Sequence, residues 1–263
     1  MTVTFRIMGT GTGVGVPAFY CACPACREAE RDPRLARLRP GAAARTPEET
    51  ILFDAGPDLR TQLLAANIRD VDVIFLSHWH FDHFAGLGEM EYYVKLWRKE
   101  PVLLYLLPEA EADLWAAFPF LDDVFTVRQL SYGQEYVFGG GLRVTPLPAA
   151  HSIPTAGFLL RAEKSLAYFT DTAGLPPVTK EYVRGVDTLV CDATFHGENW
   201  FPHSHMNTEE AAALAREVGA GRVLLTHLAM HYSDPVTTAA LTEELRALGG
   251  AVGLAFDGMD IEL

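Results

Sequence analysis

Long apolar runs and basic residues are both scarce in this sequence of 263 residues. No run approaches the ~18 consecutive apolar residues of a membrane-spanning helix, and the first residues lack the basic and apolar segments of a secretory signal peptide. Lys and Arg number 21 against 34 Asp and Glu, a net charge of −13, which argues against holding long nucleic acids by neutralising phosphates. We therefore expect a cytoplasmic protein without a membrane or long nucleic acid as partner.

Cysteines are also few, and three of the four lie together at Cys21, Cys23 and Cys26. In a reducing compartment such a cluster favours metal over a disulfide. The fourth, Cys191, lies in an apolar run and is expected to fill the core. Because repeats and long linkers are absent as well, we predict a single domain over residues 1–263, with a surface loop at 39–47.

Short apolar runs alternate with amphipathic segments along the chain. The predicted strands are 3–8, 50–53, 73–76, 102–106, 142–147, 157–161, 166–169, 188–191, 223–225 and 252–256. The predicted helices are 58–66, 88–98, 109–118, 179–183, 208–218 and 235–248, the fifth with a capping box from Asn207 to Glu210. This order favours an α/β sandwich of packed sheets with helices outside. The glycines at 9, 11, 13 and 15 do not have nucleotide-loop spacing, so we interpret this segment as a turn beside the active site.

The strongest chemical signal follows the apolar run at 73–76. His78, His80, Asp82 and His83 form an H-x-H-x-D-H pattern at a predicted strand end. In an extended turn His78 and His80 project to the same side, and a helix beginning after them would turn Asp82 and His83 toward a neighbouring point. A lone histidine is most often a core or surface group, but four ligand-type residues at this spacing predict two adjacent metal positions.

Three distant residues supply what such a site still lacks. His151, Asp171 and His227 each follow an apolar run or strand end, where open sheets present functional groups. Individually each is a weak signal, since His151 could be a loop residue, Asp171 a cap and His227 a half-buried strand residue. Together they complete two coordination spheres.

This ordered set of ligands resembles the metallo-β-lactamase superfamily over nearly the whole chain. The glycine segment, the Cys21-x-Cys23-x-x-Cys26 cluster and the segments 170–176 and 256–259 further resemble phosphoribosyl 1,2-cyclic phosphate phosphodiesterases. The resemblance implies an αββα four-layer sandwich with two divalent metals, manganese or zinc, in the active site. It also implies a separate structural zinc in the Cys-rich loop near 21–26.

Carried over residue by residue, the resemblance assigns every ligand. One metal would be held by His78, His80 and His151, the other by Asp82, His83 and His227, with Asp171 bridging the two. Asp54 matches an early aspartate of the superfamily that orients a ligand or the reacting water, although a turn residue before Gly56 is a nearly equal interpretation. His205 or His203 would be a catalytic histidine that is not a ligand, and we favour His205.

The zinc in the Cys-rich loop needs a fourth ligand, because structural zinc is normally tetrahedral. The resemblance favours His231, but three residues separate it from His227 where two are expected, so His196 stays open as the alternative. A redox-active or metal-free loop of three cysteines is the third possibility. A zinc here would brace the wall of the active site and take no part in the chemistry.

The implied reaction is metal-assisted hydrolysis of a phosphodiester, most specifically 5-phosphoribosyl 1,2-cyclic phosphate opening to ribose 1,5-bisphosphate. The metals would explain how so acidic a protein accepts an anionic substrate. The alternatives are a nuclease for RNA or 2′,3′-cyclic nucleotides, a thioesterase, and a non-hydrolytic accessory protein of cofactor biosynthesis. A redox di-iron site would prefer a glutamate at position 80. The resemblance also implies a homodimer.

Overall fold

The protein, described here by a computed structural model for residues 2–232, 234–249 and 251–263, is built on two seven-stranded sheets. The first has the strand order β14-β1-β2-β3-β4-β5-β6 and the second β13-β12-β11-β10-β9-β8-β7. The strands of the first sheet are β1 (Thr4–Gly9), β2 (Gly41–Arg45), β3 (Thr50–Phe53), β4 (Val73–Phe75), β5 (Val102–Leu106), β6 (Phe125–Gln129) and β14 (Met259–Glu262). Those of the second are β7 (Tyr136–Val137), β8 (Arg143–Pro148), β9 (Ala156–Arg161), β10 (Ser165–Phe169), β11 (Thr188–Asp192), β12 (Arg222–Thr226) and β13 (Val252–Leu254).

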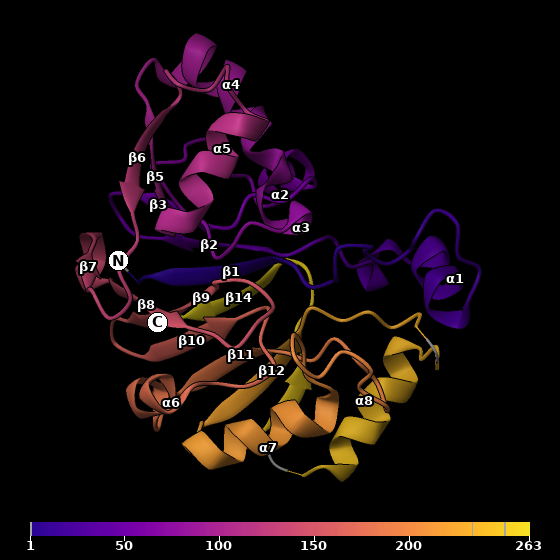
Figure 1. Cartoon of the computed structure of the whole chain (residues 1–263). Helices are drawn as coiled ribbons and strands as arrows, with labels where there is room; N and C mark the ends of the chain where they lie inside the picture. Colours follow the sequence, from indigo (N-terminus) through magenta and orange to yellow (C-terminus); the bar gives the residue numbers. More distant parts are fainter. Residues whose placement is uncertain (1, 233, 250) are drawn as a thin grey trace.

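Helices cover the outer face of each sheet (Figure 1). Those over the first sheet are α2 (Leu59–Ala65), α3 (Phe81–Phe84), α4 (Met90–Tyr92) and α5 (Glu111–Ala117). Those over the second are α6 (Pro177–Val183), α7 (Thr208–Val218) and α8 (Thr238–Ala247), while α1 (Pro24–Arg31) projects to one side. The predicted αββα four-layer sandwich is confirmed.

Strict alternation of side chains within the strands creates this layering. In β3, Ile51 and Phe53 face the interior between the sheets, whereas Leu52 packs under the helices. Successive strand residues point to opposite faces, so a strand covered on both faces is apolar throughout. Across the interior the rings of Phe53 and Phe158 lie 5.1 Å apart at a tilted angle, which is a favourable aromatic geometry that ties the two sheets together.

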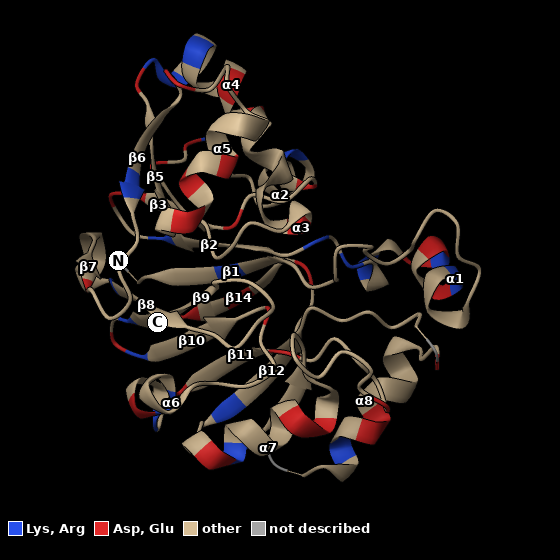
Figure 2. Cartoon of the chain, in the orientation of Figure 1, with Lys and Arg blue, Asp and Glu red and all other residues tan. Residues whose placement is uncertain are grey.

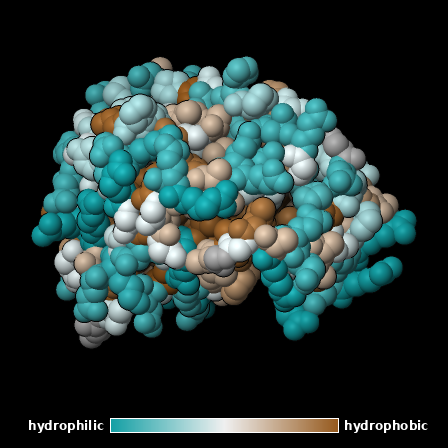
Figure 3. Space-filling view, turned by 90° about the horizontal axis from the view of Figure 1, so that it is seen from below, coloured by the Kyte–Doolittle hydropathy of each residue, from teal (hydrophilic) through white to brown (hydrophobic). Residues whose placement is uncertain are grey.

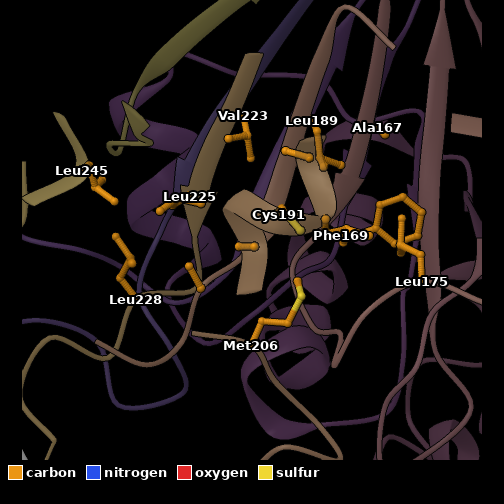
Figure 4. Close-up of a cluster of buried hydrophobic side chains, with 14 of the residues drawn as sticks. Ala167, Phe169, Leu175, Leu189, Cys191, Met206, Val223, Leu225, Leu228 and Leu245 are labelled. Atoms are coloured by element: carbon orange, nitrogen blue, oxygen red, sulfur yellow. The ribbon is translucent and has the colours of Figure 1, made fainter. Parts of the chain in front are cut away.

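The outer face of the second sheet forms a core of its own with the helices below it (Figure 4). Leu189 and Leu225 from the strands are fully buried there, together with Met206 and Leu228 from loops. Cys191 belongs to the same cluster, which confirms its predicted role as core filler. The loops that carry the candidate site are therefore anchored by apolar contacts.

Several elements differ from the sequence predictions. The predicted surface loop at 39–47 is wrong, because Gly41–Arg45 is strand β2, paired on both sides and with three fully buried alanines. The predicted helix at 88–98 is a succession of 3₁₀, α and π turns. The predicted strand at 252–256 ends at Leu254. Helix α1 and strands β6 and β7 were not predicted, since their short, mixed sequences lack a clear period.

Charged residues of both signs are interspersed on the outer helices (Figure 2). The face formed by α6, α7 and α8 is largely hydrophilic and is hollowed near its middle, where apolar residues gather (Figure 3). None of the described helices combines the length and apolar character that crossing a bilayer requires.

Candidate metal centre

The candidate ligands come together at the ends of strands from both sheets. Asp54 follows β3, and His78 to His83 follow β4 in the first sheet, while Asp171 follows β10 and His227 follows β12 in the second. These strands run parallel to a neighbour, and parallel strands present their following loops along one edge of a sheet. Face-to-face packing of the sheets brings the two edges together.

The histidine-rich turn after β4 divides its side chains between two groups. His78 Nε2 lies 3.0 Å from His80 Nδ1, and His151 Nε2 lies 3.2 Å from the same His80 atom. Helix α3 begins at Phe81 and carries Asp82 and His83, which join His227 in the second group. Asp82 Oδ2 lies 3.5 Å from both His83 Nε2 and His227 Nε2. Each group offers three ligand atoms within 4.8 Å of one another.

Asp171 lies between the two groups and faces both. Its Oδ1 is 3.9 Å from His78 Nε2 and from His151 Nε2, and 3.5 Å from His227 Nε2. Its Oδ2 is 3.1 Å from His83 Nε2. The structure thus brings together all seven predicted ligands, with the carboxylate expected to bridge at the centre.

Burial and mutual charge set the protonation of these groups. Burial holds the pKa of His78 well below its ordinary value, so its ring is neutral and able to donate a lone pair. For Asp171 burial alone would raise the pKa, but His227 and His83 outweigh it and lower the pKa well below the usual range. His78 and Asp171 are therefore held in the forms that bind metal, a neutral imidazole and an ionised carboxylate.

Two buried atoms at the centre support a cation here. His83 Nε2 and Asp171 Oδ2 have no hydrogen-bond partner among the described residues, although they are only 3.1 Å apart. Buried polar atoms without partners are costly, and a cation between them would satisfy both. The donor set of imidazoles and carboxylates suits zinc or manganese, so the residues present fit the two metals that the resemblance implies.

Further polar contacts hold the rings of the candidate ligands through their Nδ1 atoms. Asp54, fully buried, accepts from His83 Nδ1 at 2.7 Å and from Ser77 Oγ at 2.9 Å. Thr194 Oγ1 lies 2.8 Å from His227 Nδ1, and the Ser204 carbonyl oxygen lies 2.8 Å from His151 Nδ1. Such contacts orient the rings and hold the ligating nitrogen toward the metal. The geometry agrees with the orienting role expected of Asp54.

His205 lies beside both ligand groups, whereas His203 is exposed. The His205 ring stacks on His227 with centroids 5.2 Å apart and is 5.1 Å from the His151 ring. Its Nδ1 lies 2.7 Å from Asp192 Oδ2, and because a carboxylate accepts, Nδ1 donates and Nε2 is left toward the site. The structure therefore favours His205 over His203.

Asp192, Ser77 and Thr194 are residues of this site that the sequence did not single out. Asp192 is the last residue of β11 and is fully buried, also accepting from the backbone N–H groups of Thr172 and Thr194. Its carboxylate directly after the apolar run at 188–191 was the signal that could have identified it. The glycine segment does line the site, since a Cβ on Gly13 would lie 3.2 Å from Asp82 Oδ2.

The cysteine cluster forms a second candidate metal site. The sulfurs of Cys21, Cys23 and Cys26 lie within 4.8 Å of one another, and Cys26 Sγ is 3.6 Å from His231 Nδ1. His196, the alternative, places Nε2 2.6 Å from Glu244 Oε2. Burial raises the pKa of Cys26 to about 12, a penalty that a bound cation would reverse. The geometry favours His231 as fourth ligand.

Replacing Cys26 by serine is expected to remove about one zinc per chain and to lower the melting temperature, because a structural zinc contributes folding energy directly. Elemental analysis and thermal unfolding measure the two effects. Cys191→Ala is the matched control, since this cysteine fills the core and should leave the zinc content unchanged. Full zinc content in the Cys26 variant would contradict the assignment.

A family model described as the beta-lactamase superfamily domain matches residues 49–228. The matched segment contains every candidate ligand of the central cluster, and the chain belongs to the metallo-β-lactamase superfamily. The resemblance inferred from the sequence is thereby confirmed.

Two curated proteins and one solved structure illustrate what this chain is similar to. The chain is 26% identical to ribonuclease Z of Archaeoglobus fulgidus, covering 88% of this chain and 94% of that protein. It is 37% identical to an octanoyltransferase of Porphyromonas gingivalis, covering 97% of this chain but only 50% of that protein. Among solved structures, a diphosphatase from the PhnP family has 27% identity and a TM-score of 0.85, covering 99% of this chain and 98% of that chain.

Proposed function

We propose that this protein is a metal-dependent hydrolase of phosphodiesters. The observation that carries the proposal is the position of Asp171, which faces a triad of ligand atoms on each side. Two ions held in this way, manganese or zinc, would offset the charge of a phosphoryl group and acidify a water molecule. Similarity to a ribonuclease Z and to a diphosphatase supports chemistry at phosphorus.

The protein's own residues perform defined tasks in this reaction. His78, His80 and His151 would hold one ion, and Asp82, His83 and His227 the other, with Asp171 shared. His205 would hold a proton at Nε2 and deliver it to the departing oxygen, while Asp192 stabilises the charged ring through Nδ1. The stack of His205 on His227 keeps this proton beside the ligand groups.

Within phosphodiesters we propose a small cyclic phosphate as substrate. Ring strain lowers the barrier to opening a five-membered cyclic phosphate, so one water molecule and one positioned acid are enough for the reaction. Resemblance to the phosphoribosyl cyclic phosphate phosphodiesterases favours conversion of 5-phosphoribosyl 1,2-cyclic phosphate to ribose 1,5-bisphosphate, with 2′,3′-cyclic nucleotides as the other candidates.

Phosphorus NMR of the manganese-loaded protein tests the proposal. We expect a ribose 1,2-cyclic phosphate or a 2′,3′-cyclic nucleotide to open, and the reaction to stop when a chelator removes the ions and to resume when manganese is restored. If neither substrate opens while elemental analysis shows the ions bound, the phosphodiesterase proposal fails. Thioesters and the accessory role would then be tested next.

Hydrolysis of an RNA phosphodiester is the second candidate function. It is favoured by the match to ribonuclease Z over 88% of this chain. A precursor tRNA incubated under the same conditions distinguishes the two, since the net charge of −13 and the mixed charges of the outer helices predict slow RNA cleavage relative to a cyclic phosphate.

The remaining features inferred from the sequence complete the proposal. We propose a single domain over residues 1–263, a cytoplasmic location and a homodimer. Sedimentation of the purified protein tests the dimer directly.

A further inference from the structure

A cavity of about 250 Å³ lies against the first ligand group. Its lining includes His78 and His80, so whatever occupies it lies next to a candidate metal position. The walls come from three separate segments: the histidine-rich turn, the chain from β5 into α5, and the loop after His151. The volume equals that of about eight water molecules at ~30 Å³ each, enough for one planar ring system.

Apart from the two histidines and two carboxylates at the rim, the lining of the cavity is apolar. Five apolar residues form the walls: Trp79, Leu107, Ala110, Ile153 and Pro154. The Trp79 ring is held in place by a stack on Phe84, with centroids 3.9 Å apart and planes at 3°. A rigid aromatic and aliphatic wall beside a metal position is suited to a flat, uncharged group.

The charge at the rim is negative. Glu109 and Asp113 both line the cavity and both are exposed, and no Lys or Arg is among the described residues that line it. A second phosphate group entering at the rim would meet these two carboxylates, and no Lys or Arg of the described lining would offset them. The cavity therefore selects against a substrate that carries another phosphate on this side.

We propose that this cavity binds the ring substituent of the substrate and restricts the enzyme to phosphodiesters whose substituent is uncharged, such as the nucleoside part of a 2′,3′-cyclic nucleotide. This inference depends on the proposed phosphodiesterase activity and makes it more specific. It ranks the cyclic nucleotides above 5-phosphoribosyl 1,2-cyclic phosphate, whose second phosphate the rim would repel.

The test compares adenosine 2′,3′-cyclic phosphate with its 5′-phosphorylated form on the manganese-loaded protein. We expect kcat/KM to be at least about tenfold higher without the 5′-phosphate, which corresponds to ~1.4 kcal/mol. The double variant Glu109→Gln with Asp113→Asn should narrow this ratio at least threefold by improving the phosphorylated substrate.

Filling the cavity tests binding separately from the reaction. Ile153→Trp should raise KM for the cyclic nucleotide while the metal content stays constant, and Ile153→Val should not. Adenosine 3′-monophosphate, a product of the reaction, should quench tryptophan fluorescence in the normal protein and quench it less in Trp79→Phe, which reports occupancy without turnover.

The outcomes separate this inference from the proposed function. If neither cyclic nucleotide opens but ribose 1,2-cyclic phosphate does, the phosphodiesterase stands and the role of this cavity is overturned. If none of the three opens, the proposed function has failed. If both cyclic nucleotides open at similar rates, and neither the rim variants nor Ile153→Trp change kcat/KM, the phosphodiesterase stands and the role of this cavity is overturned.

Discussion

Replacement of Asp171 by alanine is expected to reduce phosphodiester hydrolysis by at least about 10³-fold, equivalent to ~4 kcal/mol of lost transition-state stabilisation. The reason is that its carboxylate faces both ligand groups, with Oδ1 toward His78 of one group and His227 of the other, and Oδ2 toward His83. Without this carboxylate several buried histidines lose their shared negative partner, and both metal positions are weakened together. Elemental analysis should show a loss of active-site metal alongside the loss of rate.

Two further variants make this expectation decisive. Asp171→Asn keeps the shape of the side chain and removes its charge. If activity depends on the charge of this carboxylate and on its shared contacts, and not on packing, this variant should also be inactive. Asp122→Ala removes an exposed carboxylate and should retain full activity and metal content. An Asp171→Ala enzyme within tenfold of normal activity would refute the shared role of this residue.

Replacement of His205 by alanine is expected to lower kcat by about 10²–10⁴-fold, the usual contribution of a positioned acid, without changing the metal content. The histidine is bound through Nδ1 to Asp192 and is not one of the seven proposed ligands, so its removal leaves the metal positions intact. The loss should be smallest for substrates with an acidic leaving group, because they need no proton. His203→Ala, which removes an exposed histidine, should be nearly silent.

Asp192→Asn tests the other half of this pair. It should lower kcat less than His205→Ala does, and the double variant should be no slower than His205→Ala alone, because the two residues act as one unit. Additive losses in the double variant would show that Asp192 acts independently of the histidine.

The sequence predicted the cluster of seven candidate ligands better than it predicted the surroundings of that cluster. These seven positions could be selected because each lies at or just after the end of an apolar run, where the period of the strand breaks. The role of Asp192 could not be predicted, because its partner, His205, is thirteen residues away. The contact between them exists only when the loop folds back onto β11. A hydrogen bond between distant segments leaves no period in a sequence.

Strand β2 was missed for a related reason. Alanine has low β propensity, and the flanking Gly, Pro and Arg residues are typical of loops. In the structure β2 lies between β1 and β3, where small side chains allow close packing on both faces. Tertiary packing thus overrides the local preference, and only the neighbouring strands reveal it.

The pairing of β14 with β1 has a consequence for how the protein is made. Thr4 is opposite Glu262 in this pairing, so the first strand to be synthesised is completed on one side by the last. Until β14 leaves the ribosome, β1 presents an open edge, which is a site for pairing with other chains. Completion of the first sheet therefore waits for the synthesis of β14, and the nascent chain depends on its later strands to protect its earlier ones.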